Sequence, residues 1–137
     1  MVDSPVQQLI DTVAWVLIED GRILCARPRG KDVFFIPGGK REGAETDLQT
    51  LVREVAEELA VELEVATADH VGTYEAAVTD GHPTVVRMAC YTAAYRGVLT
   101  ASSEIDALAW FRYRDRDLVP PVDQLLFDDL AAAGALR

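Results

Sequence analysis

The sequence is short of cysteine, of basic residues and of long apolar runs, and each shortage excludes a class of protein. Its only cysteines, Cys25 and Cys90, exclude a disulfide-framed scaffold, and we expect two buried reduced thiols rather than one bridge. It has 13 basic residues against 23 acidic ones, and the resulting net charge of −10 argues against broad binding to duplex nucleic acid. An anionic substrate would therefore need a local basic patch or a bound cation.

The chain also lacks the marks of membrane insertion and of export. Its strongly apolar run near the start, Val13 to Ile18, is far too short to span a bilayer. The first residues, MVDSPVQQLIDT, contain no basic segment of the kind that opens a secretory leader. We therefore expect a cytoplasmic protein with no membrane partner. The length of 137 residues, half of them apolar, predicts one domain, 1–137, with a sizeable hydrophobic core.

Hydrophobic periodicity predicts a mixture of strands and two helices. Extended segments are expected at Thr12–Ile18, Ile23–Arg27, Val33–Ile36 and Val61–Thr67, and from His70, Val85 and Ala107 onward. The segment TDGHPT, residues 79–84, is expected to be the turn between the two longest strands. A C-terminal helix is expected from Val122 to Ala133, with its apolar stripe at Val122, Leu125, Leu126, Leu130 and Ala133. These elements predict a layered α/β (α+β) domain.

The other helix has a clear start and one apolar face. Thr46 and Gln49 fit a capping box, in which each side chain bonds to the main chain of the other residue, so the helix should begin near Asp47. At about 100° per residue, five apolar residues fall in one stripe: Leu48, Leu51, Val52, Val55 and Leu59. This stripe should face the core.

Three glutamates, Glu54, Glu57 and Glu58, fall within a second arc that flanks this stripe. Like charges at these spacings destabilise a helix by roughly a few tenths of a kcal/mol each, and only Arg53 offers local relief. A solvated acidic face is the ordinary explanation for such a cluster. Two features favour a cation site instead: the cluster borders the core stripe, and it follows a glycine-rich loop at a fixed distance. Mg²⁺ binds through carboxylates together with substrate phosphates.

The segment from Gly39 to Val61 resembles the Nudix box of the Nudix (MutT-like) hydrolases. The matching pattern is Gly39, five residues, Glu45, seven residues, Arg53-Glu54-Val55, one residue, Glu57-Glu58, two residues and Val61. One signature position departs from the family: Ala60 stands where the family usually has a helix-ending glycine. If its φ is positive, Ala60 carries up to about 1 kcal/mol of strain. The departure affects the local turn more than the chemistry.

The resemblance implies an α/β/α sandwich with a mixed β-sheet, and hydrolysis of a nucleoside diphosphate linked to another group. It implies Mg²⁺ or Mn²⁺ as the cofactor. The implied metal ligands are the side chains of Glu54, Glu57 and Glu58, the carbonyl of Gly38 and, secondarily or through water, Glu45. Arg53 is implied to orient the glutamates. Metal ions that bridge a pyrophosphate neutralise developing charge and lower the pKa of bound water, which agrees with these assignments.

Outside the box, each candidate residue has an ordinary explanation beside the functional one. Glu104, six residues before Trp110, stands where MutT-like members carry an extra glutamate that serves as metal ligand or general base; an exposed loop glutamate explains it equally well. Arg27 and Lys40 resemble phosphate-contacting positions of the family. Both also fit surface side chains with solvated charges.

Two further positions are candidates for binding the nucleobase. Of Phe34 and Phe35, one is expected in the core and the other, which we take to be Phe35, against the base. Asp123, in the segment VPPVDQ, stands where MutT-like members place a base-reading polar residue after two prolines. A plain aspartate in the first turn of a helix explains Asp123 nearly as well.

The sequence as a whole predicts a Nudix pyrophosphohydrolase acting on a small-molecule nucleotide, most simply a nucleoside triphosphate, oxidised or not. The alternative substrate is an ADP-ribose-type nucleotide sugar. The alternative of another class is a non-catalytic Nudix domain that senses a nucleotide. Retention of Glu54, Glu57 and Glu58 favours the enzyme, because a sensing domain should have lost them. The sequence does not decide between a monomer and a homodimer.

Overall fold

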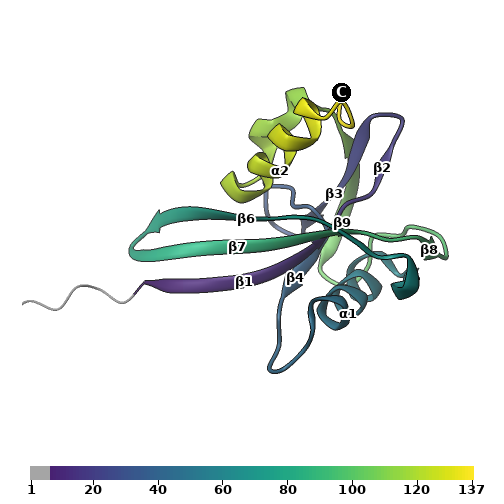
Figure 1. Ribbon diagram of the computed structural model, residues 1–137, viewed down its shortest axis with the longest axis horizontal. Helices are drawn as coiled ribbons and strands as arrows, with labels where there is room; N and C mark the ends of the chain where they lie inside the picture. Colours follow the sequence, from purple (N-terminus) through teal and green to yellow (C-terminus); the bar gives the residue numbers. More distant parts are fainter. Residues whose placement is uncertain (1–6) are drawn as a thin grey trace, which may run out of the picture.

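The computed structural model describes residues 7–137 and consists of a mixed β-sheet between two helices (Figure 1). Residues 1–6, the first half of the segment in which a secretory leader was not expected, lie outside the described range. The elements in chain order are β1 (Gln8–Trp15), β2 (Ile18–Glu19), β3 (Arg22–Pro28), β4 (Gly38–Lys40), α1 (Asp47–Leu59), β5 (Glu62–Leu63), the 3₁₀ turn η1 (Val65–Thr67), β6 (Asp69–Asp80), β7 (His82–Thr92), β8 (Tyr95–Arg96), β9 (Ile105–Phe111), the 3₁₀ segment η2 (Tyr113–Leu118) and α2 (Pro121–Ala132). None of the helices in residues 7–137 combines the length and the apolarity that a membrane crossing requires.

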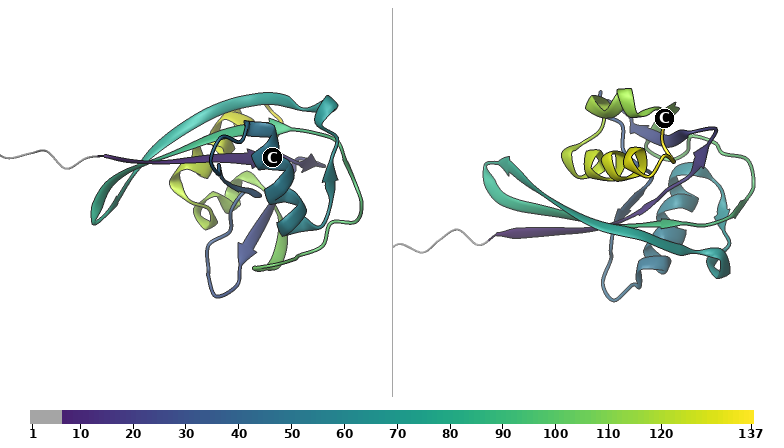
Figure 2. Two further views of the ribbon diagram at one scale, coloured as in Figure 1. Left: turned by 90° about the horizontal axis from the view of Figure 1, so that it is seen from below. Right: turned by 45° about the horizontal axis from the view of Figure 1, so that its top comes forward.

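The central sheet has the strand order β4-β1-β7-β6 and separates two apolar clusters. β1 and β7 run parallel, and the other two pairs are antiparallel. The helices α1 and α2 lie on opposite faces of this sheet (Figures 1 and 2). Along β1, Val13 and Trp15 pack in the cluster that contains α1, whereas Ala14 packs in the cluster that contains α2. The predicted α/β/α arrangement with a mixed sheet is therefore confirmed.

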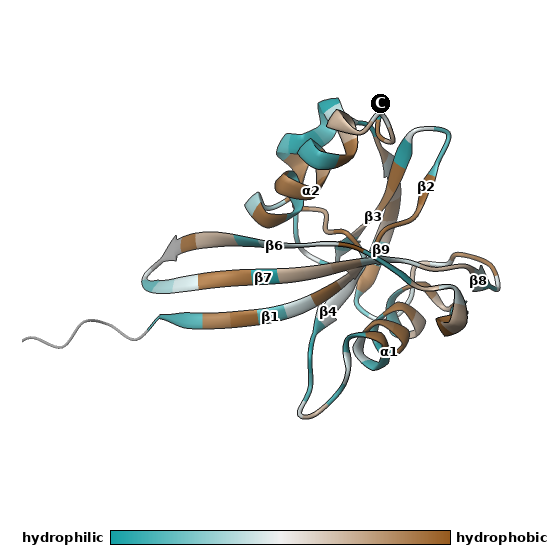
Figure 3. Ribbon diagram, viewed as in Figure 1, coloured by the Kyte–Doolittle hydropathy of each residue, from teal (hydrophilic) through white to brown (hydrophobic). Residues whose placement is uncertain are grey.

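The hairpin of β6 and β7 projects beyond the helices, together with the first residues of β1 (Figure 1). The turn predicted within residues 79–84 is present but shorter than expected: it is confined to Gly81, with φ of 79°, and the strands reach Asp80 and His82. Pro83 fits within β7 because β1 pairs only from Thr84 onward, where an N–H group is needed. Apolar segments of β1 and β7 continue into this projection (Figure 3).

The extended segment predicted at Val33–Ile36 forms no strand, because only Phe35 pairs there, in a single bridge with Ala26. Two other predicted strands have clearly different bounds in the structure. The first strand begins at Gln8 and ends at Trp15 rather than running from Thr12 to Ile18; Ile18 instead pairs with Ile23 in a separate hairpin. The strand expected at 61–67 is reduced to β5, followed by η1. The cause is Thr67, whose hydroxyl donates to the Glu64 carbonyl at 2.6 Å and accepts from the Ala94 N–H at 2.8 Å, which closes a turn.

The C-terminal helix α2 lies where the sequence predicted it, but its buried arc differs. Val122, Leu126 and Leu130 are buried as expected, whereas Leu125 is exposed. Phe127, outside the predicted stripe, is completely buried. Phe127 belongs to the core cluster that also contains Val119, and α2 packs against both the sheet and η2.

The helix α1 begins and ends as the sequence predicted. The capping box is present: the Thr46 hydroxyl accepts from the Gln49 N–H at 3.2 Å, and the Gln49 side chain accepts from the Thr46 N–H at 2.9 Å. Leu51, Val55 and Leu59 are buried against β1 and its neighbours. At the other end, Ala60 adopts the left-handed conformation (φ 58°, ψ 32°) that glycine occupies without strain.

Replacing Ala60 with glycine should therefore stabilise the protein. Relief of the left-handed strain outweighs the added freedom of the unfolded chain, and we expect a gain of about 0.5–1 kcal/mol in the free energy of unfolding, measured by urea denaturation. Ala56, exposed inside the same helix, is the matched control, because Ala56→Gly should lose about 0.5–1 kcal/mol. Equal losses in both variants would contradict the strain at Ala60.

Candidate active site

The paired glycines of β4 allow α1 to approach the sheet closely. Gly38 has φ of 150°, and a Cβ atom there would lie 2.0 Å from the carbonyl oxygen of Val13, so a side chain would push β4 off β1. A Cβ atom at Gly39 would lie 2.3 Å from the carboxyl carbon of Glu54. The absence of a side chain at Gly38 thus lets β4 lie against β1, and its absence at Gly39 leaves the space that the Glu54 carboxylate of α1 occupies.

Arg53 lies at the centre of this acidic face. Its Nε and Nη2 donate to the two carboxylate oxygens of Glu45, each at 2.9 Å. Its Nη1 donates to Glu54 Oε1 at 2.7 Å, and its Nη2 also donates to the Lys40 carbonyl at 3.1 Å. The bonds from Arg53 lower the pKa of Glu45 to about 2. One guanidinium group therefore fixes the carboxylates of Glu45 and Glu54 relative to β4.

Glu58 and Glu57 have opposite environments. Glu58 is half-buried, and its Oε1 accepts from the Gly38 N–H at 2.9 Å. Burial raises the pKa of Glu58 to about 8; the bond from Gly38 opposes this rise, and the nearby charges of Glu54 and other glutamates add to it. Burial likewise raises the pKa of Glu54, against the bond from Arg53. Glu57 is 55% exposed, and its Oε1 lies 4.0 Å from Arg53 Nη1.

The donor chemistry of this face fits a hard divalent cation. Its side-chain donors are carboxylate oxygens, the ligands that Mg²⁺ and Mn²⁺ prefer. The like charges that raise the pKa of Glu58 are the charges that a cation would offset. Within residues 7–137, however, no three potential ligands surround one point. Glu54 is turned toward Arg53 and Glu58 toward Gly38, so side-chain rotation would have to precede binding.

Glu104 lies on the same side of the molecule as this cluster. It is exposed in the turn before β9, and its carbonyl accepts from the Arg29 N–H at 2.6 Å. Its charge contributes to the raised pKa of both Glu54 and Glu58. The structure therefore brings Glu104 near the glutamates of α1, although the two are 46 or more residues apart in sequence.

A cavity of about 340 Å³ begins at this acidic face and runs between the sheet and the start of α2. Its sheet wall includes Ile10, Ala76 and Val86, which lie on the α2 side of the projecting strands. Most of the lining is apolar. The charged residues that line it are Lys31, Lys40, Glu58 and Asp123. The cavity thus contains two carboxyl groups: Glu58 from α1 and Asp123 from α2.

Asp123 is a buried carboxyl group in the first turn of α2, with only 3% of its surface exposed. Its Oδ2 accepts from the Ile36 N–H at 2.9 Å. Burial raises its pKa to about 7, against the main-chain N–H groups of Ile36 and of Asp123 itself. Cys25 and Cys90 are free and buried, as predicted. Burial raises the pKa of both thiols, that of Cys90 to about 12, and the nearby charge of Asp123 adds to both increases. Asp123 is therefore more deeply placed than an exposed helix-end aspartate.

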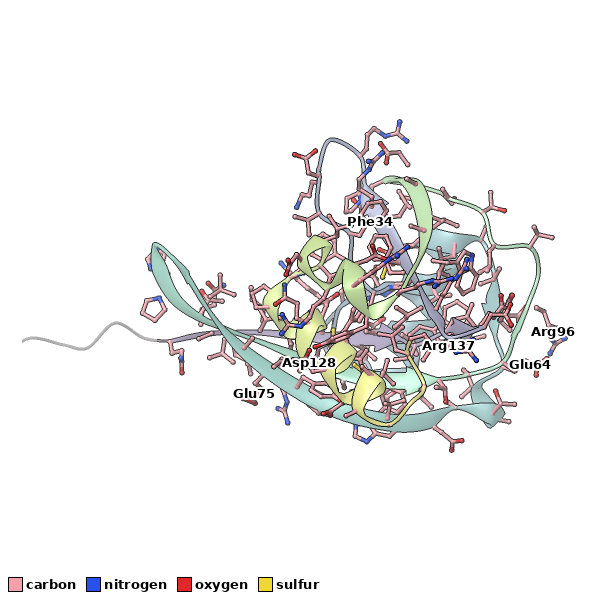
Figure 4. All side chains as sticks on the ribbon, turned by 90° about the horizontal axis from the view of Figure 1, so that it is seen from above. Phe34, Glu64, Glu75, Arg96, Asp128 and Arg137 are labelled. Carbon is pink, nitrogen blue, oxygen red and sulfur yellow. The ribbon has the colours of Figure 1, made fainter. Side chains whose placement is uncertain are left out.

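The two neighbouring phenylalanines separate as expected. Phe35 lines the cavity, whereas Phe34 (Figure 4) packs edge-on against Phe111 in the core, with 4.9 Å between ring centres. This confirms that one ring belongs to the core and leaves Phe35 facing the space that a ligand would fill.

The two basic residues that the sequence suggested for phosphate binding differ in position. Lys40 lines the cavity, but Arg27 does not: its Nε is paired with Asp106 at 3.1 Å and its guanidinium lies 5.5 Å from the ring centre of Phe34. The structure adds Lys31, which lines the cavity with its Nζ 5.8 Å from the ring centre of Phe35. Lys31 could not be singled out from the sequence, because composition does not tell which side chain of the loop PRGKDV turns inward.

Comparisons with known proteins agree with this geometry. Residues 9–128 match the family model of the NUDIX domain. The CTP pyrophosphohydrolase of Escherichia coli (strain K12) is 31% identical over 137 residues, which cover 95% of this chain and 97% of that protein. The solution structure of the E. coli ORF135 protein is similar with a TM-score of 0.73 at 28% identity, covering 95% of this chain and 97% of that one.

A further solved structure is similar in fold alone. The MutT protein of Methanosarcina mazei Go1 gives a TM-score of 0.75 at 18% identity, with 96% of this chain and 99% of that chain covered. The family match spans nearly the whole described chain, and it includes the paired glycines, Arg53 and the glutamates of α1. The chain therefore belongs to the Nudix family.

Proposed function

We propose that this Nudix pyrophosphohydrolase cleaves the phosphate chain of a nucleoside triphosphate, with Mg²⁺ or Mn²⁺ as its cofactor. The observation that carries the proposal is the single cavity that joins Glu58 and the paired glycines to the buried carboxyl group of Asp123. Its volume of about 340 Å³ falls in the usual range for small-molecule sites, roughly 300–1,000 Å³. One part suits metal-bound phosphates, and the other offers apolar walls with one buried polar group for a base.

The residues proposed to hold the metal all belong to or adjoin the acidic face. They are Glu54, Glu57 and Glu58, with the carbonyl of Gly38 and, through water, Glu45. A bound divalent cation would neutralise charge that develops on the phosphates and lower the pKa of the attacking water. Arg53 would keep Glu54 in place while the metal is bound. Glu104, near the same cluster, is the candidate to accept the proton from that water.

The phosphates of the substrate also need fixed positive charge, because the chain as a whole carries −10. Lys40 and Lys31 both line the cavity, and we assign them to phosphate binding. Arg27, the other candidate from the sequence, is engaged by Asp106 outside the cavity lining and keeps at most an indirect role through that pair.

The base is proposed to lie between Phe35 and Asp123. An ionised Asp123 accepts a hydrogen bond from an exocyclic amino group, whereas a neutral Asp123 donates one to a carbonyl oxygen. The similarity to a protein named CTP pyrophosphohydrolase supports cytosine, which carries such an amino group, as the preferred base. Phe35 would cover the face of the ring.

A substrate panel tests the function directly. The products of the four ribonucleoside triphosphates, the four deoxynucleoside triphosphates, their oxidised forms and ADP-ribose should be separated by anion-exchange chromatography after incubation with and without Mg²⁺. This detects the nucleoside monophosphate from every substrate as well as any pyrophosphate or phosphate. We expect metal-dependent turnover with CTP or dCTP among the best substrates. Turnover of ADP-ribose alone would replace the proposed substrate class with the nucleotide-sugar alternative, and no turnover with any metal would contradict the proposed hydrolysis.

Glu57→Gln should lower kcat by about two orders of magnitude or more, because the metal-bound transition state would lose a ligand charge. The fold should survive, since Glu57 is exposed and no core residue depends on it. Glu62→Gln, an exposed glutamate on β5, is the control and should turn over like the wild type. Near-wild-type kcat of Glu57→Gln at saturating Mg²⁺ would remove Glu57 from the ligand set.

Divalent metal should raise the Tm of the wild type. A cation that binds only the folded state at 10 to 100 times its Kd adds about 1.4 to 2.7 kcal/mol. The combined replacement of Glu54, Glu57 and Glu58 by glutamine should abolish this rise. Glu64→Gln is the control: Glu64 (Figure 4) is paired with Arg96 and does not belong to the acidic face, so this variant should keep the response. A triple variant that responds like the wild type would place the metal elsewhere.

The preference for CTP over UTP should rise with pH. Because the pKa of Asp123 lies near 7, the neutral acid below that pH can donate to the uracil carbonyl, and the carboxylate above it accepts from the cytosine amino group. Asp123→Asn, which presents an amide to the base, should lose the pH dependence and lower the CTP/UTP ratio of kcat/KM at pH 8 by about 5- to 150-fold, equivalent to 1–3 kcal/mol.

The stability of the same variant provides a second measurement. The folded pKa of Asp123 lies above the ordinary value of 3.8, so wild-type stability falls as pH rises from about 4 to about 7. Asp123→Asn cannot ionise and should be the more stable protein above pH 7. A uniform drop in kcat/KM for both nucleotides, with no change in their ratio, would exclude Asp123 from base recognition.

A further inference from the structure

The loop between β4 and α1, residues 41–46, is held by two arginines from opposite sides. Arg53 binds the carboxylate of Glu45, and Arg41 Nη1 donates to the carbonyl oxygen of the same residue at 2.9 Å. The Glu45 carboxylate also accepts from the Glu42 N–H at 2.9 Å and the Thr50 hydroxyl at 3.0 Å. Glu45 is thus fixed through both its main chain and its side chain.

Arg41 connects this loop to the sheet and to the start of α1. Its Nε donates to Asp11 Oδ2 on β1 at 3.0 Å, and its Nη2 donates to Asp47, the first residue of α1. Its N–H donates to the Asp11 carbonyl at 3.1 Å. The second carboxylate oxygen of Asp47 accepts from the Tyr91 hydroxyl on β7. Arg41 therefore joins β1, the loop and α1, and Asp47 joins the start of α1 to β7.

The charges make Arg41 difficult to replace. Its side chain is only 24% exposed, so its ion pairs are less screened than those at an open surface. The pKa of Asp47 is lowered although burial opposes this, because Tyr91 and Arg41 bond to its carboxylate. Without Arg41, the carboxylates of Asp11 and Asp47 would lose the cation they share, next to a face that is already acidic.

We propose that Arg41 is a positioning residue for the metal-binding face. Arg41 donates to Asp11 (3.0 Å) and to the Glu45 carbonyl (2.9 Å). Arg53 in turn donates to the Glu45 carboxylate (2.9 Å) and to Glu54 (2.7 Å). By fixing the main chain of Glu45, Arg41 sets the place from which Glu45 holds Arg53, and so the direction in which Glu54 points. The proposal rests on the proposed function, because it assigns Arg41 to the same site.

Arg116 provides a matched control. It makes two bonds to Asp128 on α2 (Figure 4), at 2.7 and 2.9 Å, and its side chain is 33% exposed. It therefore resembles Arg41 in burial and in the number of carboxylate bonds. It neither lines the cavity nor contacts the loop.

The test compares Arg41→Ala, Arg41→Lys and Arg116→Ala. In Arg41→Ala, kcat on the best nucleotide and the affinity for Mn²⁺, followed by electron paramagnetic resonance without substrate, should both fall about 10- to 100-fold. The nucleotide KM should change by less than about 3-fold, since Arg41 does not reach the cavity. Main-chain amides of residues 40–47 should exchange hydrogen faster. Arg41→Lys should recover only part of each loss, because an ammonium group cannot bond in three directions as the guanidinium fork does.

Arg116→Ala should lower Tm to a similar extent while leaving kcat, Mn²⁺ affinity and exchange of the loop unchanged. Wild-type kcat and Mn²⁺ affinity in Arg41→Ala, with only a lower Tm, would overturn the proposal. If the wild type hydrolyses no nucleotide, the proposed function fails, and the Mn²⁺ affinity and loop exchange still decide the role of Arg41. If Arg41→Ala does not fold, Arg41→Lys carries the comparison: its losses support the proposal, and wild-type values overturn it.

Discussion

The bidentate ion pair between Arg53 and Glu45 is the interaction on which the site depends. It joins the middle of α1 to the loop before the helix, and the same guanidinium group reaches Glu54 and the Lys40 carbonyl. A helix that carries several carboxylates beside its buried stripe needs a fixed positive charge to hold them in defined directions before any cation is bound. Arg53 supplies that charge, and the bare backbone of Gly39 gives the Glu54 carboxylate its space against β4.

The two faces of the sheet divide the work of fold and function. On the α1 face, Val13, Trp15 and the buried stripe of α1 form a closed cluster that anchors the helix. On the α2 face, the core closes around Phe127 and its neighbours, but the strands continue past α2, and Ile10 and Val86 become a cavity wall. An apolar surface needed for the core thus passes directly into an apolar surface available to a ligand.

Sequence reasoning was most successful where local physics decides the outcome. The capping box at Thr46 and the left-handed Ala60 depend on a few adjacent residues, so both ends of α1 were predicted correctly. It failed where distant contacts decide: Thr67 bonds to Ala94 and turns an expected strand into a 3₁₀ turn, and Phe127 of α2 is buried in the core although it lies outside the predicted stripe. Likewise, the sequence does not distinguish the roles of Arg27 and Lys31, two basic residues close together in the chain. In the structure, Arg27 is paired with Asp106, whereas Lys31 lies beside the ring of Phe35.

The half-buried Glu58 and the buried Asp123 are two carboxyl groups of one cavity that differ in their surroundings. Both Glu58 and Asp123 accept one main-chain N–H bond and have pKa values raised by burial. Glu58 also lies among other glutamates, so its ionised form is stabilised best by a cation that those glutamates share. The pKa of Asp123 is raised by desolvation alone, so its protonation can change without disturbing a metal site. The same side-chain chemistry therefore fits two different proposed roles, metal binding beside α1 and base recognition beside α2, because the surrounding charges differ.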